Sequence, residues 1–463
     1  MDGLQDDTDE NVRSAALSKS VKPRNLNHGL DGLQDDTDGN VRDAALSDSV
    51  KSVNPWQSVI QTLPPGYKQT EVGMIPEDWE VRPLGDLAFV TAGGTPSRAI
   101  AQYWNGDIPW ITTSEIDFRT IDHAKQFITK EGVTNSAAKL LPPGTLLMAL
   151  YGQGKTRGKV GVLGIEAASN QACAAISLHQ DVSRDFIFHF LSSQYEAIRR
   201  LSNTGNQENL NSSLVRSIPI LLPTLAEQQA IAEALSDVDA LIDALERLIS
   251  KKRAIKQGAM QALLTGRRRL SGFDGEWEVT RFGDITQLRL DRVDPRRSGE
   301  VDFCVELENI EQGTGRLLSY ADTDTGLSLK SVFQRDDVLF GKLRAYLRKF
   351  WLADRDGVCS TEIWVFKALR SRIIPTFLFQ LVTMDEFIEV ASTAYGTHMP
   401  RSDWKIVQNH EVRLPSLAEQ TAIAAILSDM DAEIAALERR RDKTKLLKQG
   451  MMQELLTGRI RLV

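Results

Sequence analysis

Cysteine is scarce in this chain, which has three cysteines, Cys173, Cys304 and Cys359, in 463 residues. They are far apart and odd in number, so they form neither a disulfide framework nor a zinc-binding pattern. The six histidines show no metal-ligand spacing either. We therefore expect a cytoplasmic protein, kept in a reducing compartment, with no metal site of its own.

Long apolar runs are also missing. No stretch approaches the roughly 18 residues of a membrane span, and the N-terminus is acidic and lacks the apolar core of a signal peptide. The net charge of −7 is unusual for a nucleic-acid binder, but residues 1–54 alone hold 11 acidic and 6 basic side chains. The rest of the chain is nearly neutral, which permits local basic surfaces.

Catalytic motifs are absent as well. The chain has no NPPY or DPPY motif for methylating a base amine, and Asp403 with Lys405 is only a fragment of a nuclease pattern. Residues 149–156 (ALYGQGKT) resemble a loosened phosphate loop, but a glycine-rich, β-like sequence follows where a helix is needed. We predict a non-catalytic chain without a cofactor. A nucleotide-binding enzyme that uses residues 149–156 is one alternative.

The dominant feature that is present is a long repeat. Residues 222–270 and 414–462 align without a gap at an offset of 192, and 32 of the 49 positions are identical. Thr224 and Ser416 stand three residues before Glu227 and Glu419, as in a capping box. Gly266 and Gly458 follow the two helical patterns, as helix stop signals do. Each copy therefore predicts one helix of about 40 residues, roughly 60 Å long.

Both predicted helices carry a narrow apolar seam with spacings of four and three residues, typical of a coiled coil. The seam residues are Ile231, Leu235, Val238, Ile242, Leu245, Ile249, Ile423, Leu427, Met430, Ile434 and Leu437. We predict that the helices pair with each other in antiparallel fashion; packing of each helix on its own domain is the alternative. Gly258 and Gly450 interrupt both patterns at matched positions, which suggests a close backbone approach or a bend.

The repeat divides the chain into five expected parts. Residues 1–54 form an acidic, HEAT-like double repeat that is too short to build a solenoid core and that we expect to be weakly ordered. Residues 55–221 and 271–413 are strand-rich units that begin alike and then diverge, and residues 222–270 and 414–463 are the helices. The predicted fold class is α+β: two strand-rich α/β domains separated by two long helices, with a pseudo-two-fold relation.

Three kinds of segment could contact DNA. One is a basic β-hairpin near residue 155, and a second is a predicted strand at residues 342–348 with basic and aromatic residues on one face. The third kind comprises the amide-rich residues 204–211 and the matching residues 395–401. A solvated strand face or a plain polar loop would show the same patterns. The candidate DNA-binding residues are Lys155, Arg157, Lys159, Asn206, Gln207, Asn209, Asn211, Lys342, Arg344, Tyr346, Arg348, Tyr395, Thr397, His398 and Arg401.

Together these segments resemble the DNA-specificity subunit of type I restriction-modification systems. The resemblance spans roughly residues 66–462 and rests on YKQTEVGMIPEDWEVRPLGDL, SNQA, CSTEI, LPTLAEQQAIAEAL, LPSLAEQTAIAAIL and the two KQGxMQxLLTGR ends. Residues 1–54 depart from the family pattern. A coiled-coil scaffold without a DNA role is the second alternative, and the basic and amide-rich loops argue against it.

The resemblance implies two target-recognition domains, each of which reads one half of a split, asymmetric site in double-stranded DNA. It implies that the paired helices set the spacer between the half-sites and dock two modification (methyltransferase) subunits, and that restriction (translocase and nuclease) subunits join through the complex. S-adenosylmethionine, ATP and magnesium would then belong to those partners. The recognised bases and the spacer length do not follow from the sequence.

Overall fold

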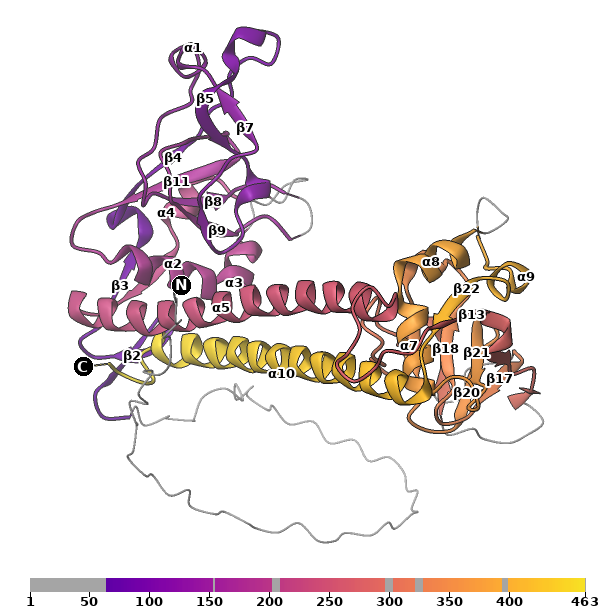
Figure 1. Ribbon diagram of the computed structural model, residues 1–463. Coiled ribbons are helices and arrows are strands. Elements are labelled where there is room, and N and C mark those ends of the chain that lie inside the picture. The colour runs from indigo at the N-terminus through magenta and orange to yellow at the C-terminus, as the bar shows by residue number, and fades with distance from the viewer. Residues whose placement is uncertain are drawn as a thin grey trace, which may run out of the picture. The chain divides into compact units, whose positions relative to one another are not determined.

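The structure is a computed structural model that describes residues 64–152, 155–201, 209–295, 303–320, 328–393 and 399–462. The chain divides into two units, Met1–Thr62 and Leu63–Val463. The acidic double repeat expected at residues 1–54 lies outside the described residues, and all that follows concerns the second unit. Its two long helices, α5 (Leu225–Leu264) and α10 (Leu417–Leu455), run side by side (Figure 1).

The two helices pair in antiparallel fashion, as the repeated seam predicted. Five ion pairs connect them. Four of these form two matched sets at the offset of 192, and the fifth, Lys252–Glu433 (2.7 Å), has no counterpart. Lys256–Asp431 (2.5 Å) corresponds to Lys448–Asp239 (2.6 Å), and Arg253–Glu438 (2.5 Å) corresponds to Lys445–Glu246 (2.7 Å). The seam residues in the middle of the helices, among them Ile242, Leu245, Ile249 and Ile434, are buried.

The first part of each seam has a second role that the sequence did not separate from pairing. Ile231 and Leu235 belong to the core of the first domain, together with Leu455 and Leu456 at the end of α10. In the same way, Ile423 and Leu427 belong to the core of the second domain, together with the end of α5. Each domain therefore packs on the start of one helix and the end of the other, and the two domains lie at opposite ends of the pair (Figure 1).

The first domain contains a five-stranded sheet in the order β4-β11-β8-β9-β6, a three-stranded sheet β10-β5-β7, and the two-stranded pairs β1-β2 and β12-β3. Its strands are β1 (Tyr67–Thr70), β2 (Gly73–Pro76), β3 (Glu80–Pro83), β4 (Ala88–Ala92), β5 (Trp104–Ile111), β6 (Thr120–Ile121), β7 (Gln126–Ile128), β8 (Leu146–Ala149), β9 (Val160–Leu163), β10 (Ala168–Ser169), β11 (Cys173–Leu178) and β12 (Pro219–Leu222). Its helices are α1 (Lys130–Thr134), α2 (Arg184–Ser193), α3 (Tyr195–Arg200) and α4 (Ser212–Arg216), with 3-10 turns η1 (Leu84–Asp86), η2 (Ala101–Tyr103) and η3 (Thr113–Glu115).

The second domain has two four-stranded sheets, β14-β21-β18-β19 and β15-β17-β20-β16, and the pair β13-β22. Its strands are β13 (Glu278–Arg281), β14 (Thr286–Leu288), β15 (Arg292–Val293), β16 (Cys304–Val305), β17 (Lys330–Phe333), β18 (Val338–Gly341), β19 (Phe350–Leu352), β20 (Gly357–Ser360), β21 (Ile363–Ala368) and β22 (Glu411–Leu414). Its helices are α7 (Pro375–Thr383), α8 (Asp385–Ser392) and α9 (Trp404–Val407), with 3-10 turns η4 (Phe282–Asp284), η5 (Leu307–Asn309) and η7 (Ala345–Leu347).

A buried carboxylate joins three segments at each end of the helix pair. Glu227, near the start of α5, accepts hydrogen bonds from Trp79 Nε1 (3.1 Å) and from Arg461 Nε and Nη2 (2.6 and 2.8 Å). Glu419, near the start of α10, accepts the same set from Trp277 (3.2 Å) and Arg269 (2.7 and 2.8 Å). We call each set, Trp79–Glu227–Arg461 and Trp277–Glu419–Arg269, a carboxylate latch.

The latches correct the expected capping boxes. Thr224 and Ser416 do accept hydrogen bonds from the backbone N–H groups of Glu227 and Glu419, as predicted. The two carboxylates, however, do not turn back to the cap residue, because tryptophan and arginine side chains distant in sequence bind them instead. At the first latch Arg461 also binds Asp78, and this hydrogen bond lowers the pKa of the Asp78 carboxyl below its ordinary value.

The glutamine after each of these glutamates also bonds to distant segments, in this case through backbone groups. Gln228 accepts a hydrogen bond from Ser183 N (2.9 Å) and donates to Pro223 O (2.9 Å). Gln420 accepts from Ile374 N (3.0 Å) and donates to Pro415 O (3.0 Å). The buried Glu-Gln pair of each LAEQ motif therefore fixes the domain to the helix that follows it.

We predict that Glu227→Ala lowers the free energy of unfolding by about 3 kcal/mol or more, because it leaves Arg461 and Trp79 without their partner in a buried site. Glu227 is 1% exposed. Glu246→Ala is the matched control, since Glu246 forms an ion pair whose side chains are 47–48% exposed, and its loss should cost under about 1 kcal/mol. Denaturant unfolding of both variants decides this, and equal losses would contradict the role of the latch.

Candidate DNA-contacting edges

Each domain has one strand that leaves its sheet and meets a segment far away in sequence. In the first domain, Leu150 after β8 donates its N–H to Ala172 O (2.8 Å) and accepts at its carbonyl from Leu210 N (3.0 Å). In the second, Lys342 after β18 donates to Glu362 O (3.0 Å) and accepts from Ser402 N (2.9 Å). These bonds bring together the segments that the sequence singled out. We call residues 150–152 and 155–159 with 209–211, and residues 342–349 with 399–402, the exit edges.

The exit edge of the first domain contains the expected β-hairpin, because β8 and β9 pair in antiparallel fashion. Only part of its positive charge lies at the surface. Lys155 is exposed, whereas Arg157 is buried and donates to Arg199 O (3.1 Å). Lys159 is held by Asp117 at 2.6 Å. Arg157 is thus not the exposed hairpin residue that the pattern suggested, since its guanidinium packs against the end of α3.

The hairpin also bears on the nucleotide-binding alternative. After Thr156 the chain enters β9, which begins at Val160, rather than a helix. A phosphate loop needs a helix N-terminus at this point, because the free N–H groups of the first turn bind the phosphates. Residues 149–156 therefore lack the element that would bind a nucleotide.

Two of the four asparagine and glutamine candidates, Asn206 and Gln207, lie outside the described residues. Asn209 is half-buried. Asn211 is the N-cap of α4, where its side-chain oxygen accepts a hydrogen bond from Leu214 N at 2.8 Å. Asp403 occupies the matching N-cap position of α9 and accepts from Lys405 N. The residue type at this position thus serves helix capping in both domains, and Asp403 is not part of a nuclease site.

The strand expected at residues 342–348 is wrong. β18 ends at Gly341, and the chain then makes the 3-10 turn η7. Arg344 and Arg348, on either side of that turn, are in the left-handed region with φ of 55° and 52°. Two such residues reverse the chain and abolish the alternation of a strand, so the four candidates do not share one face. Strained residues of this kind gather at functional sites.

The turn separates the candidates by role. Arg348 forms an ion pair with Asp385 on α8, and its carbonyl accepts from Gly313 N (2.9 Å). Lys342 is half-buried and its backbone bonds to Glu362 and Ser402, while Arg344 and Tyr346 are exposed. Arg401 makes two hydrogen bonds with Glu362, at 2.9 and 3.1 Å, and these raise the pKa of Arg401. Tyr395, Thr397 and His398 lie outside the described residues.

The exposed side chains of the two edges are therefore few. They are Tyr151 and Lys155 in the first domain and Arg344, Tyr346, Met399 and Arg401 in the second, of which Arg401 is bound by Glu362. Tyr151 and Met399 were not among the candidates. Tyr151 ends an apolar run that predicts a buried strand, and the sequence holds no signal that the strand stops two residues before it.

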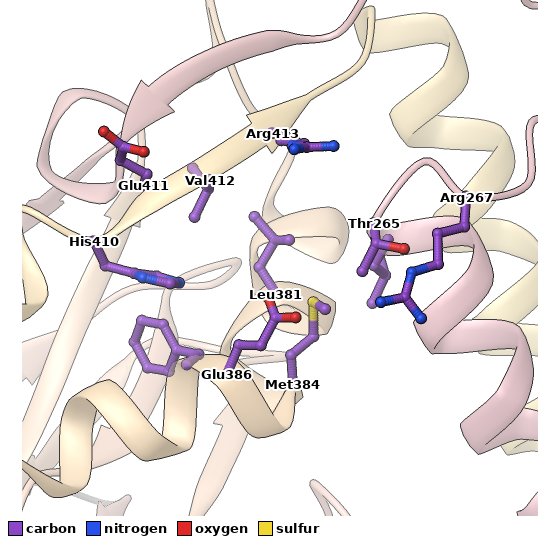
Figure 2. Close-up of a pocket in the computed structure, with 11 residues that line it drawn as sticks. Thr265, Arg267, Leu381, Met384, Glu386, His410, Glu411, Val412 and Arg413 are labelled. Carbon is purple, nitrogen blue, oxygen red and sulfur yellow. The ribbon is translucent and has the colours of Figure 1, made fainter.

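A cavity of about 260 Å³ lies between the end of α5 and the second domain (Figure 2). Its apolar wall includes Leu381 and Phe387, and burial lowers the pKa of His410, on the opposite side from Arg267. None of its lining residues belongs to an exit edge. Among the described residues there is no group of three or more His, Cys, Asp or Glu side chains that could hold a metal ion, and no helix long and apolar enough to cross a membrane.

Comparison with known proteins identifies the family. The model of the type I restriction modification DNA specificity domain matches residues 76–255 and 274–447, one match for each domain and most of the helix after it. The chain therefore belongs to this family and is a DNA-specificity subunit rather than a methyltransferase or nuclease. The predictions of a specificity subunit and of the α+β fold class are confirmed, and the two alternatives find no support.

Individual relatives agree with this assignment. The MjaIX specificity subunit of Methanocaldococcus jannaschii is 22% identical over 436 residues, which cover 85% of this chain and 96% of the relative. The EcoR124I/EcoR124II specificity subunit of Escherichia coli is 28% identical over 197 residues, 41% of this chain and 46% of the relative. The crystal structure of an S subunit from M. genitalium has the same fold, with a TM-score of 0.52, 14% identity and coverage of 81% and 96%.

We predict that Arg348 and Asp385 act on stability as one unit. Because the two side chains are 35% and 46% exposed, Arg348→Ala or Asp385→Ala should each cost up to about 1 kcal/mol, and the double variant no more than the larger loss. A double-mutant cycle in urea measures the coupling. Arg344→Ala, at the other end of the turn, should stay within about 0.5 kcal/mol of the original chain. Fully additive losses would mean that Asp385 does not hold Arg348.

Proposed function

We propose that each domain reads one half of a split, asymmetric site in double-stranded DNA through its exit edge. The observation that carries this proposal is the matched pair of exit edges on domains at opposite ends of one antiparallel helix pair. A two-fold dimer reads a palindrome in this way, with its half-sites spaced by the protein. Here the exposed residues differ, Tyr151 and Lys155 against Arg344 and Tyr346, so the two half-sites differ as well.

The exposed residues of the edges suit this role. Arginine and lysine donate to phosphate oxygens or to the acceptors of guanine, and tyrosine offers an aromatic face and a hydroxyl. Arg344 has no hydrogen bond or ion pair through its side chain among the described residues, and its backbone is held by Pro400 O (2.8 Å). A fixed backbone with an uncommitted guanidinium is what a DNA contact needs.

The helix pair then acts as the ruler between the half-sites. Each domain is fastened to the pair by its own carboxylate latch, so the distance between the domains follows the length of the helices. The matched ion pairs fix the antiparallel register, so that an insertion in one helix alone would misalign them.

A second part of the proposed function is docking of two modification subunits on the outer face of the helices. Four exposed residues of α5, Arg247, Lys251, Ile255 and Gly258, lie within one face about 80° wide. The matching residues of α10 are Arg439, Lys443, Leu447 and Gly450, and all four are exposed. Three of the four pairs are identical. Exposure to solvent alone would not require identical residues at these positions.

The two glycines support docking rather than the expected contact within the chain. A Cβ added at Gly258 or Gly450 would meet no atom within 4 Å among the described residues, and both helices continue through these positions. Glycine in a helix costs about 1 kcal/mol relative to alanine. Close approach of a partner's backbone would explain why glycine occurs at both positions despite this loss of helix stability. The partners would supply S-adenosylmethionine-dependent methylation, and restriction subunits would join with ATP and magnesium.

We predict that four extra residues in each helix lengthen the spacer. Duplicating residues 245–248 in α5 and 437–440 in α10 adds about 6 Å near the middle of the pair, which corresponds to one or two base pairs. Both half-site sequences should stay unchanged. Sequencing of methylated sites in cells that carry the variant with its modification subunit provides the measurement. An unchanged spacer in an active variant, or an altered half-site, would show that the helices are not the ruler.

We predict that Gly258→Gln and Gly450→Gln each remove one modification subunit. Because the positions are open, the variants should unfold at the same temperature as the original chain or a higher one. Light scattering of the purified complex should show two modification subunits for the original chain, one for each single variant and none for the double variant. Ser250→Gln, at an exposed position that is not matched in α10, is the control and should keep both.

A further inference from the structure

A positively charged site lies beside the exit edge of the first domain, and it comes from a segment that the sequence did not single out. The guanidinium carbon of Arg98 lies 3.7 Å from the ring centroid of Trp104 and 5.3 Å from that of Trp110. Nη2 of Arg98 donates to Gln126 Oε1 at 2.7 Å. The two tryptophans meet edge to face at 5.1 Å, so the cation rests on a rigid aromatic support.

The loop that carries Arg98 is held from both sides. Trp110 Nε1 donates to Gly94 O (2.9 Å) and Trp104 Nε1 donates to Ser97 O (3.1 Å), which ties the loop to β5. A Cβ at Gly94 would stand 2.1 Å from Ala138 N, and one at Gly93 would stand 2.2 Å from Asn170 O. The loop is therefore packed against its neighbours at backbone distance, and it presents Arg98 in one place.

The contacts that hold Arg98 contribute little to the stability of the fold. An exposed cation–π contact contributes only about 0.5–1 kcal/mol. Arg98 is exposed, and no carboxylate among the described residues lies within ion-pair distance of it. One nitrogen is committed to Gln126, which leaves the other donors of the planar fork available to a ligand with paired acceptors.

The position of Arg98 connects it to the exit edge. Thr95, in the same loop, hydrogen-bonds to Gln171, and the next residue, Ala172, accepts from Leu150 N at 2.8 Å. Gly94 N donates to Ser169 O (2.8 Å) in the same turn. Two hydrogen bonds, Thr95 to Gln171 and Leu150 to Ala172, therefore link the start of this loop to the strand exit that presents Tyr151 and Lys155.

We propose that Arg98 reads a guanine in the first half-site, with Trp104 and Gln126 as positioning residues that hold its guanidinium. The inference rests on the proposed reading of DNA by this domain. Guanine O6 and N7 form the acceptor pair that matches an arginine fork in the major groove, and a phosphate offers the same acceptors without sequence information. Prior immobilisation on Trp104 lowers the ordering cost of the contact.

The experiment uses the whole chain assembled with its modification subunits. The methylated sites of Arg98→Ala, Arg98→Lys and Gln126→Ala are sequenced, and DNA affinity is measured over a salt series. We expect Arg98→Ala to lower affinity for the original site by roughly 5- to 100-fold and to relax one guanine position of the first half-site. Arg98→Lys should not restore that position, because an ammonium cannot form the paired contact. Gln126→Ala should shift the specificity in the same direction by a smaller amount.

Three outcomes would overturn the proposal. Uniform loss for all sequences, a smaller salt slope and rescue by lysine would assign Arg98 to a phosphate. If neither the DNA affinity nor the methylated sequence changed, Arg98 would not contact DNA. Arg119, a 73% exposed arginine of the same domain, is the control. An equal effect of Arg119→Ala would mean that the loss of any positive charge weakens binding. Continued reading of the second half-site in these variants separates failure of this inference from failure of the proposed function, in which neither domain would contribute to the site.

Discussion

The carboxylate latches are the interactions on which the arrangement of this protein depends. Glu227 and Glu419 are 1% exposed, and a buried carboxylate is strongly unfavourable unless charged and hydrogen-bonded partners surround it. Each one requires an arginine from the end of the other helix and a tryptophan from the start of a domain. Three segments must therefore meet at one point, and the same requirement at both ends fixes the domains to the helix pair.

Between the latches, ion pairs determine how the helices align. An apolar seam with repeated spacing tolerates a shift of one heptad, whereas opposite charges match in only one register. The pseudo-two-fold relation is imperfect at two places. Lys252–Glu433 has no counterpart, since Thr444 and Leu241 stand at the matching positions, and Glu438 differs from Glu246 in its partners. Burial would raise the pKa of Glu438, but hydrogen bonds from Arg316 and Arg253 outweigh this and lower it. Arg316 comes from the second domain, so that domain has an additional polar attachment to α10, while Glu246 at the matching position is exposed.

The sequence predicted the features that depend on local periodicity. The two helices begin at the residues after Thr224 and Ser416, and their seams are buried except for the half-buried Val238, Met430 and Leu437. Both features were predictable because a period of 3.6 residues and a hydroxyl cap act over one or two turns. The role of Glu227 could not be predicted in this way, since Arg461 lies 234 residues away and outcompetes the cap. The alternation of residues 342–348 also led to a wrong prediction of a strand. Arg344 and Arg348 adopt the left-handed conformation, which glycine or asparagine usually marks in a sequence.

Under the proposed function, the same physical difference allows the side chains of the exit edges to change while the framework stays the same. The exit edges are held by backbone groups, Leu150 with Leu210 and Lys342 with Ser402, and backbone bonds tolerate a change of side chain. The side chains at positions 151, 155, 344 and 346 project from these edges without holding them together. The latches and ion pairs, in contrast, consist of side chains that have no substitute. Under the proposed function, a change in the DNA sequence that this chain reads would require new residues at the exit edges or at Arg98 and none in the helices.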